Sequence, residues 1–139
     1  MNHTHILELV RPRCAALLLA TTLGACAQPD LVPLKRGEIA APNGFCTTEP
    51  HTANLIVSVK NIGRDNAAAS TTVVEFSPGG SATLPTPAIA AGGTVDLPPT
   101  PMPGACFDPD CGFTIKVNAV SPISESNKNN NTADGLCIG

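Results

Sequence analysis

The sequence predicts an all-β protein, an immunoglobulin-like sandwich of two sheets built from about seven short strands. Charged residues make up only 14% of the chain, and 14 prolines and 12 glycines among 139 residues suit a protein with many turns. Apolar and polar residues alternate over several short stretches, which turn residues separate at fairly regular spacing. The length is that of one domain, and no repeat of about 20–50 residues is visible, which excludes a solenoid or propeller.

The stretch from Asn54 to Gly63 is the clearest predicted strand, and we expect the other strands to be organised around it. Leu55, Val57 and Val59 share one face, because successive side chains of a strand point to opposite sides. The β-branched residues of this stretch lose rotamers in a helix, which argues against that alternative. We expect Gly63 to end the strand by taking a backbone angle that other residues avoid.

The remaining strands are predicted from the same alternation. A short strand within 28–34 is expected at a sheet edge, because Pro33 has no N–H to donate to a neighbouring strand. Residues 45–47 are expected to add a few paired positions. Further strands are predicted at 71–76, 81–84, 94–97, 113–119 and 132–138. Residues 98–111 are rich in proline, show no periodicity and are predicted to form a loop.

Residues 1–25 are predicted to be a lipoprotein signal peptide. Two arginines precede an apolar run at 15–23 that is too short to cross a bilayer as a helix. The run ends in Leu23-Gly24-Ala25-Cys26, which resembles the lipobox of bacterial lipoproteins. This resemblance implies cleavage before Cys26, a lipid on Cys26 and a short tether over residues 26–28. The protein would then be anchored in the cell envelope, in the periplasm or facing the surface.

The competing interpretation is ordinary secretion. Ala25-Cys26-Ala27 is itself an Ala-x-Ala cleavage site, and a cut there would release a soluble protein. From Cys26 onward the chain carries 6 Lys and Arg against 10 Asp and Glu, a net charge of −4. Anionic lipid head groups do not attract such a chain, so its membrane contact is expected through the lipid anchor only. Without a basic patch or interleaved aromatic residues, it is not expected to bind nucleic acid.

Four stretches together resemble a CARDB domain, the cell adhesion related domain found in bacteria. They are Pro29-Asp30-Leu31, Val59 to Gly63, Ala90 to Thr94, and Val120 to Asn131, the last containing the most specific piece, Glu125-Ser126-Asn127-Lys128-Asn129-Asn130. The likeness covers residues 29–139. It implies an immunoglobulin-like sandwich in an exported protein, with adhesion or interaction roles and no catalytic residues. The enlarged loop at 98–111 and four added cysteines depart from the family pattern.

The run from Glu125 to Asn131 supplies many oxygen atoms, which raises the question of a calcium site. Acidic ligands are scarce in this run, and their spacing does not fit a calcium loop of the EF-hand type. Asparagine side chains commonly satisfy backbone groups in turns. A structural role is therefore expected, and no metal site is predicted.

Four cysteines follow the predicted lipidation site: Cys46, Cys106, Cys111 and Cys137. Four cysteines allow three pairings. Cys106 and Cys111 flank a Phe-Asp-Pro-Asp turn and can close on each other, which leaves Cys46 to pair with Cys137. The rival is a four-cysteine zinc site, but structural zinc sites usually group their ligands in close pairs, and Cys46 and Cys137 are each isolated in sequence. Since export also favours oxidation, two disulfides are predicted.

The sequence carries no arrangement typical of an enzyme, and no cofactor is predicted. His51 is the one histidine after Cys26, and its polar surroundings favour a solvated side chain over a catalytic one. Asp108 and Asp110 lie on a proline-containing turn, with no sign of the cleft that paired carboxylates need. Phosphate-cradling glycine motifs and histidine clusters are absent from the sequence.

A non-catalytic binding or adhesion module that recognises a protein or a surface polymer is the predicted function. The alternative is a structural accessory subunit of a larger cell-envelope complex. The sequence contains no Trp or Tyr, which weakens a carbohydrate-binding role because sugar sites usually stack on aromatic rings. The loop from Pro98 to Cys111 is the predicted recognition surface, with Phe107, Asp108 and Asp110 at its tip, because a rigid sandwich leaves specificity to its loops. In the alternative arrangement, Phe107 folds inward and plugs the end of the sandwich.

Overall fold

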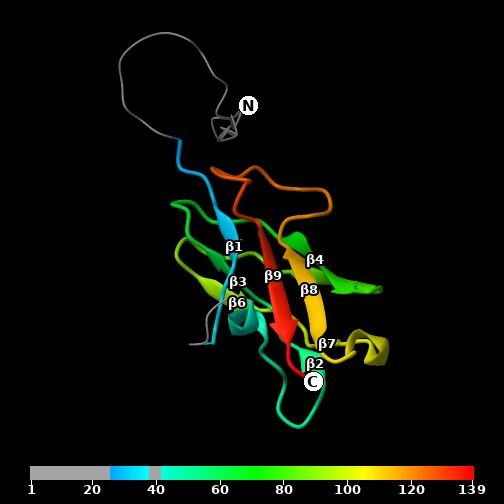
Figure 1. Cartoon of the computed structure of the whole chain (residues 1–139). Coiled ribbons are helices and arrows are strands. Elements are labelled where there is room, and N and C mark those ends of the chain that lie inside the picture. The colour runs from blue at the N-terminus through cyan, green and yellow to red at the C-terminus, as the bar shows by residue number, and fades with distance from the viewer. Residues whose placement is uncertain (1–25, 38–41) are drawn as a thin grey trace, which may run out of the picture.

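The structure is a computed structural model that describes residues 26–37 and 42–139. The predicted signal peptide at residues 1–25 lies outside the described residues. The described part contains nine strands, and every pairing among them is antiparallel. They form the two layers of an all-β sandwich (Figure 1), which confirms the predicted fold class. The number of strands exceeds the expected seven because two of them are pairs of residues that alternation cannot reveal.

One layer is a four-stranded sheet with the strand order β5-β4-β8-β9. Its strands are β4 (Ser70–Ser77), β5 (Ser81–Thr86), β8 (Cys111–Lys116) and β9 (Thr132–Cys137). The other layer contains a three-stranded sheet of order β1-β3-β6 and the separate pair β2-β7. Its strands are β1 (Leu31–Pro33), β2 (Asn54–Leu55), β3 (Ser58–Asn61), β6 (Thr94–Asp96) and β7 (Thr100–Pro101). Two short 3₁₀ helices, η1 (Asn43–Phe45) and η2 (Gly104–Cys106), lie in the connections.

The core lies between the layers and is made mainly of aliphatic side chains. The fully buried ones include Leu31, Leu55, Val57, Val59, Val74, Leu97 and Ile115. Two of the four phenylalanines, Phe76 and Phe113, are buried as a tilted pair with ring centroids 6.4 Å apart. Gly135 faces Phe113 across the β8–β9 pair, where a Cβ atom would overlap the ring. The core, which is poor in aromatic residues, therefore contains one buried pair of aromatic rings.

The central predicted strand is divided in the structure. Leu55, Val57 and Val59 are all buried, as the alternation predicts. However, Leu55 pairs with Thr100 in β7, whereas the residues from Ser58 onward pair with β1 and β6. The chain changes partners at Ile56 and Val57, so these two residues belong to no strand. Local alternation cannot detect such a change, because both segments keep the same faces toward the core.

Several element boundaries also differ from the expectation. The predicted loop at 98–111 contains β7 and η2, and residues 45–47 lie at the end of η1. Strand β5 extends to Thr86 and includes Pro85, which its edge position permits. Strand β8 begins at Cys111 and ends at Lys116, two residues before Asn118 adopts a φ of 55°. As predicted, β1 with Pro33 lies at a sheet edge.

The reason for glycine at position 63 differs from the expectation. Gly63 is not among the glycines with positive φ, so the expectation that it uses a special backbone angle was wrong. A Cβ atom there would lie 2.4 Å from the Gln28 oxygen, 2.5 Å from the Asp30 nitrogen and 2.6 Å from the carbonyl carbon of Pro29. Gly63 is needed because the backbone leading into β1 packs directly against it.

Candidate functional site

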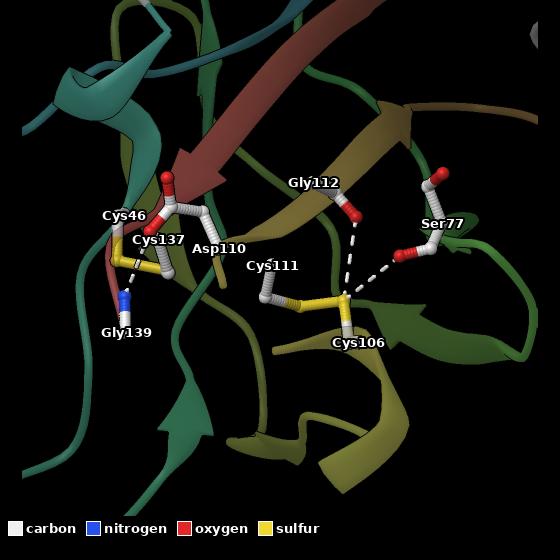
Figure 2. Close-up of a disulfide and its surroundings, with 8 residues drawn as sticks. All are labelled: Cys46, Ser77, Cys106, Asp110, Cys111, Gly112, Cys137 and Gly139. Atoms are coloured by element: carbon white, nitrogen blue, oxygen red, sulfur yellow. Dashed lines mark hydrogen bonds between the residues drawn. A yellow bond between two sulfur atoms is a disulfide. The ribbon is translucent and has the colours of Figure 1, made fainter. Parts of the chain in front are cut away.

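Two disulfides bind together the end of the sandwich at which the predicted recognition loop lies (Figure 2). Cys46 is bonded to Cys137, and Cys106 is bonded to Cys111. These are the two pairs that the sequence predicts. Cys111 and Cys137 are opposite each other across β8 and β9, so the two bonds lie side by side. Together they attach the chain after η1 and the loop after η2 to the same pair of strands.

Two carbonyl groups approach the shorter disulfide. The Cys106 sulfur lies 3.3 Å from the Ser77 oxygen and 3.6 Å from the Gly112 oxygen, the dashed contacts of Figure 2. Because a disulfide sulfur carries no proton, these are close sulfur–oxygen contacts and not donated hydrogen bonds. The buried Cys106 is therefore held by packing and by its covalent bond.

The three residues predicted at the loop tip have different environments. Phe107 is half-buried and packs against the core, so it takes part in closing this end of the sandwich. Asp110 accepts a hydrogen bond from the Gly139 N–H at 3.1 Å, which ties the loop to the end of β9. Phe107 therefore packs against the core, and Asp110 ties the loop to the chain after β9. Asp108 is exposed to solvent, where a partner could reach it.

An apolar groove lies on one side of the sandwich. Its volume is about 670 Å³. It is lined by Ser70 and residues 85–87 at the ends of β4 and β5, and by residues 96–99 at the end of β6 and directly after it. Ile56, at the point where the central strand divides, also lines it. Pro98 and Pro99 thus bring the first part of the predicted recognition loop into this groove, away from the tip residues.

Polar groups in the groove are few. The hydroxyl of the buried Thr86 pairs with that of Thr72 at 2.8 Å, which satisfies both. The Ser70 hydroxyl oxygen is buried and has no hydrogen-bond partner in the described part of the chain. A buried hydroxyl without a partner carries a desolvation cost that a bound molecule can offset. Ser70 therefore offers one unused polar contact in an otherwise apolar surface.

Asp96 is the one charged residue on the groove wall. Its carboxylate accepts a hydrogen bond from the Ser58 hydroxyl at 2.6 Å, and its other oxygen is 2.6 Å from the Arg36 guanidinium. The Ser58 hydrogen bond lowers the pKa of Asp96 below its ordinary value of 3.8, and Arg36 adds to the effect, although partial desolvation opposes it. The carboxylate is thus ionised at neutral pH and bound by Ser58 and Arg36, and the other residues that line the groove are uncharged.

The run from Glu125 to Asn131 connects the two layers. The Glu125 carboxyl is buried; one oxygen accepts the Leu31 N–H at 2.7 Å, and the other accepts Asn118 Nδ2 at 2.7 Å and also Asn131 Nδ2. Asn130 Nδ2 donates to the Asp30 carboxyl at 2.9 Å. These contacts agree with the expected structural role. Those of Asn118 and Asn131 with Glu125 are local, whereas those that involve Leu31 and Asp30 reach across about 100 residues of sequence. No local pattern in the sequence predicts these partners of Glu125.

The described residues show no grouping suited to metal chemistry. Within 26–37 and 42–139, no three His, Cys, Asp or Glu side chains come close enough to hold a metal ion. The cysteines at 46, 106, 111 and 137, which the zinc alternative would require, are oxidised in pairs. His51 is exposed, in a turn with a φ of 63°.

The fold and the disulfide-bound loops define an immunoglobulin-like sandwich domain. The chain belongs to the CARDB family, whose model matches residues 28–134, and it is therefore an adhesion-related domain of bacterial extracellular type. A search of curated proteins finds no match. Among solved structures, it is similar to a CARDB domain from Pyrococcus furiosus that was crystallised in complex with di-metal ions. That similarity has 20% identity and a TM-score of 0.46, over 80% of this chain and 88% of the other.

In the part of the chain that the structure describes, no helix has the length and apolar character needed to cross a bilayer.

Proposed function

We propose that this protein is an exported, lipid-anchored binding module without catalytic activity, and that it recognises a protein partner through the apolar groove beside Pro98 and Pro99. The main support for this proposal is the groove itself, since a large apolar hollow with a few polar groups is the usual form of a recognition site. Family membership supports an adhesion-related role. Lipid anchoring is supported by Leu23-Gly24-Ala25-Cys26.

The chemistry of the groove favours a protein over a sugar polymer. Its lining is dominated by proline and aliphatic side chains, with Ser70 as the one unsatisfied hydroxyl. A polysaccharide presents many hydroxyl groups, which need hydrogen-bonding partners and aromatic platforms that the groove does not offer. Apolar side chains of a protein would be desolvated there, and the four prolines on its walls keep the binding surface rigid.

A charge placed in the groove tests its role. The purified domain is added to envelope fractions of the producing bacterium, either untreated or digested with protease. We expect protease-sensitive binding that Ile56→Glu and Pro98→Glu each weaken about tenfold or more, because an unpaired carboxylate must be desolvated at the interface. Thr83→Glu, on the exposed outer side of β5, is the matched control and should bind normally.

Other outcomes would contradict the proposal. Normal binding by both groove variants would exclude the groove, and loss of binding by Asp108→Ala would instead place recognition at the loop tip. Binding that survives protease would indicate a polymer. Elution of the detergent-extracted protein in a discrete large complex would favour the accessory-subunit alternative.

Lipidation of Cys26 is tested separately with a labelled fatty acid. We expect the label on the wild type and none on Cys26→Ser. The structure has Cys26 in a disulfide bond, and one sulfur cannot carry both a disulfide and a lipid thioether. Intact mass before and after reduction distinguishes the two states, and a purified mature protein with Cys26 in a disulfide would refute the anchor.

A further inference from the structure

We infer that the end of the sandwich next to Cys26 lies against the bilayer, so that the domain stands with its disulfide-bound end directed away from the membrane. This inference rests on the proposed lipidation of Cys26 and adds the surface that meets the membrane. It follows from three features: the short distance between the anchor and the folded domain, the side chains exposed around the anchor, and the arrangement of the two ends.

The anchor is joined to the domain almost without a linker. Only Ala27 separates Cys26 from Gln28, whose carbonyl accepts the Arg64 N–H at 3.1 Å. Asp30 is bound on both sides, since its N–H donates to the Asn61 side chain at 3.1 Å and its carbonyl accepts the Ile62 N–H at 2.8 Å. Two residues span at most about 7 Å, so acyl chains on Cys26 would begin beside these bonds. Such an anchor restricts how far the domain can turn away from the membrane.

Cys26 lies next to the loop that follows β3. Cys26, Ile62, Arg64 and Ser126 line the same shallow hollow, with a volume of about 360 Å³. Ser126 belongs to the β8–β9 connection, and its N–H donates to the Pro29 carbonyl at 3.0 Å. Figure 1 shows that this connection and the start of β1 occupy the same end of the sandwich. These two loops therefore lie beside the anchor and would be about as close to the membrane as Cys26 is.

The side chains exposed on these two loops suit a lipid surface. The large hydrophobic residues exposed in the described chain are Ile62 at 52%, Val120 at 49% and Ile138 at 69%, and the first two lie at the Cys26 end. Arg64 and Lys128 are exposed on the same loops, against one exposed carboxylate, Asp65. Although the mature chain has a net charge of −4, this end is not acidic. Apolar and cationic side chains are those that peripheral membrane surfaces present to lipid.

The opposite end has a different character. Chain direction places the end of β9 and the C-terminus there (Figure 1), together with the two disulfides, the exposed Asp108 and Ile138. If the Cys26 end meets the bilayer, Ile138 lies at the end of the sandwich that faces away from it. Ile138 is thus a control for Ile62 and Val120, since it is also aliphatic and is more exposed than either.

Because the sequence contains no tryptophan or tyrosine, the fluorescence of one introduced tryptophan reports on a single position. Single-tryptophan variants Ile62→Trp, Val120→Trp and Ile138→Trp carry one fluorophore each. The full lipid-bearing proteins are reconstituted in vesicles of phosphatidylethanolamine and phosphatidylglycerol, with or without brominated acyl chains. We expect brominated lipid to quench the emission of Ile62→Trp and Val120→Trp to about half and to leave Ile138→Trp unchanged, since interfacial residues reach the head-group boundary. The same variants with Cys26→Ser should show no quenching.

The outcomes separate this inference from the proposed function. Mass spectrometry first establishes whether the purified protein carries lipid; if it does not, the anchor is refuted and the orientation falls with it. If lipid is present and the three tryptophans are quenched equally, or none is quenched, the anchor stands and the orientation is overturned. Strong quenching at Ile138→Trp alone would show that the opposite end faces the bilayer.

Discussion

At the scale of single residues, buried polar side chains with complete hydrogen bonding hold loops and strands together. Asn61 is fully buried and uses all its capacity: its oxygen accepts the N–H groups of Asp30 and Gly63, and its nitrogen donates to the carbonyls of Asp65 and Ile89. Glu125 does the same for β1 and the β8–β9 connection. Such groups stabilise a fold only while every partner is present, because an unmet buried donor is costly.

Glu125→Gln is therefore expected to destabilise the domain by about 2–4 kcal/mol. The amide has nearly the same shape, but in either orientation its NH₂ group faces a donor, either the Leu31 N–H or the amide nitrogens of Asn118 and Asn131. Denaturant unfolding measures the effect, with the exposed neighbour change Ser124→Ala as control. Equal stability of Glu125→Gln and wild type would show that these hydrogen bonds do not hold the layers together.

At the scale of elements, the pairing of β3 with β6 positions Asp96, whose pKa lies below its ordinary value. Asp96 lies opposite Ser58 in this pair and accepts a hydrogen bond from its hydroxyl, and Arg36 lies beside the same carboxylate. Both side chains of the Arg36–Asp96 ion pair are nearly half exposed, so solvent screens it and its contribution is small. The pH dependence of stability therefore reports mainly on the hydrogen bond from Ser58.

This pair predicts a loss of stability in acid. The pKa of Asp96 is lower in the folded than in the unfolded chain, so its contribution is fully present above about pH 4 and is lost as the pH falls through the folded-state value. We expect wild type to exceed Asp96→Asn in unfolding free energy at pH 7 and the difference to shrink below about pH 4. Parallel curves for the two proteins from neutral to acidic pH would exclude the contribution.

The loop between β6 and β8, predicted as a recognition surface, has at its tip a side chain that packs against the core. Phe107 packs against the core, so Phe107→Ala should cost about 1–3 kcal/mol, less than the loss for a fully buried Phe because the ring is only half-buried. The exposed Asp108→Ala is the control and should leave the melting temperature unchanged. If Phe107→Ala kept full stability and lost binding to the envelope fraction, Phe107 would be a recognition residue.

At the scale of the whole molecule, covalent bonds support a core with few aromatic residues. The Cys46–Cys137 bond spans 91 residues and the Cys106–Cys111 bond spans 5. In the chain-entropy model, these loops correspond to about 4–5 and about 2 kcal/mol respectively, since a longer closed loop restricts the unfolded chain more. The long bond ties the segment after η1 to β9 and so joins the two layers.

Removing each bond separately tests this difference. We expect Cys46→Ala with Cys137→Ala to lower the unfolding free energy by about twice as much as Cys106→Ala with Cys111→Ala. Peptide mapping without reductant should find the two pairs in the wild type. A Cys46–Cys106 peptide, free thiols or bound zinc would contradict the arrangement, and equal losses for the two variants would contradict the loop-length argument.

Much of this protein was determined by the sequence alone. Period-2 alternation is a local property, so it predicted the all-β class and the buried face of Leu55, Val57 and Val59. Cysteine spacing predicted the pairs that the structure contains, because a five-residue separation with a turn favours local closure. Four short stretches, among them those around Asn61 and Glu125, together predicted the family to which the chain belongs.

Only the tertiary structure decided which segments meet. The division of the central strand depends on Thr100, a residue 45 positions from its partner Leu55, and no local pattern carries that information. The partners of Glu125 and the contact beneath Gly63 likewise depend on chain segments that fold together from far apart. The apolar groove exists because Ser70, Pro85 and Pro98, each unremarkable in its own segment, line one hollow. Alternation records which way a side chain points, but its neighbours are set by the packing of the two layers.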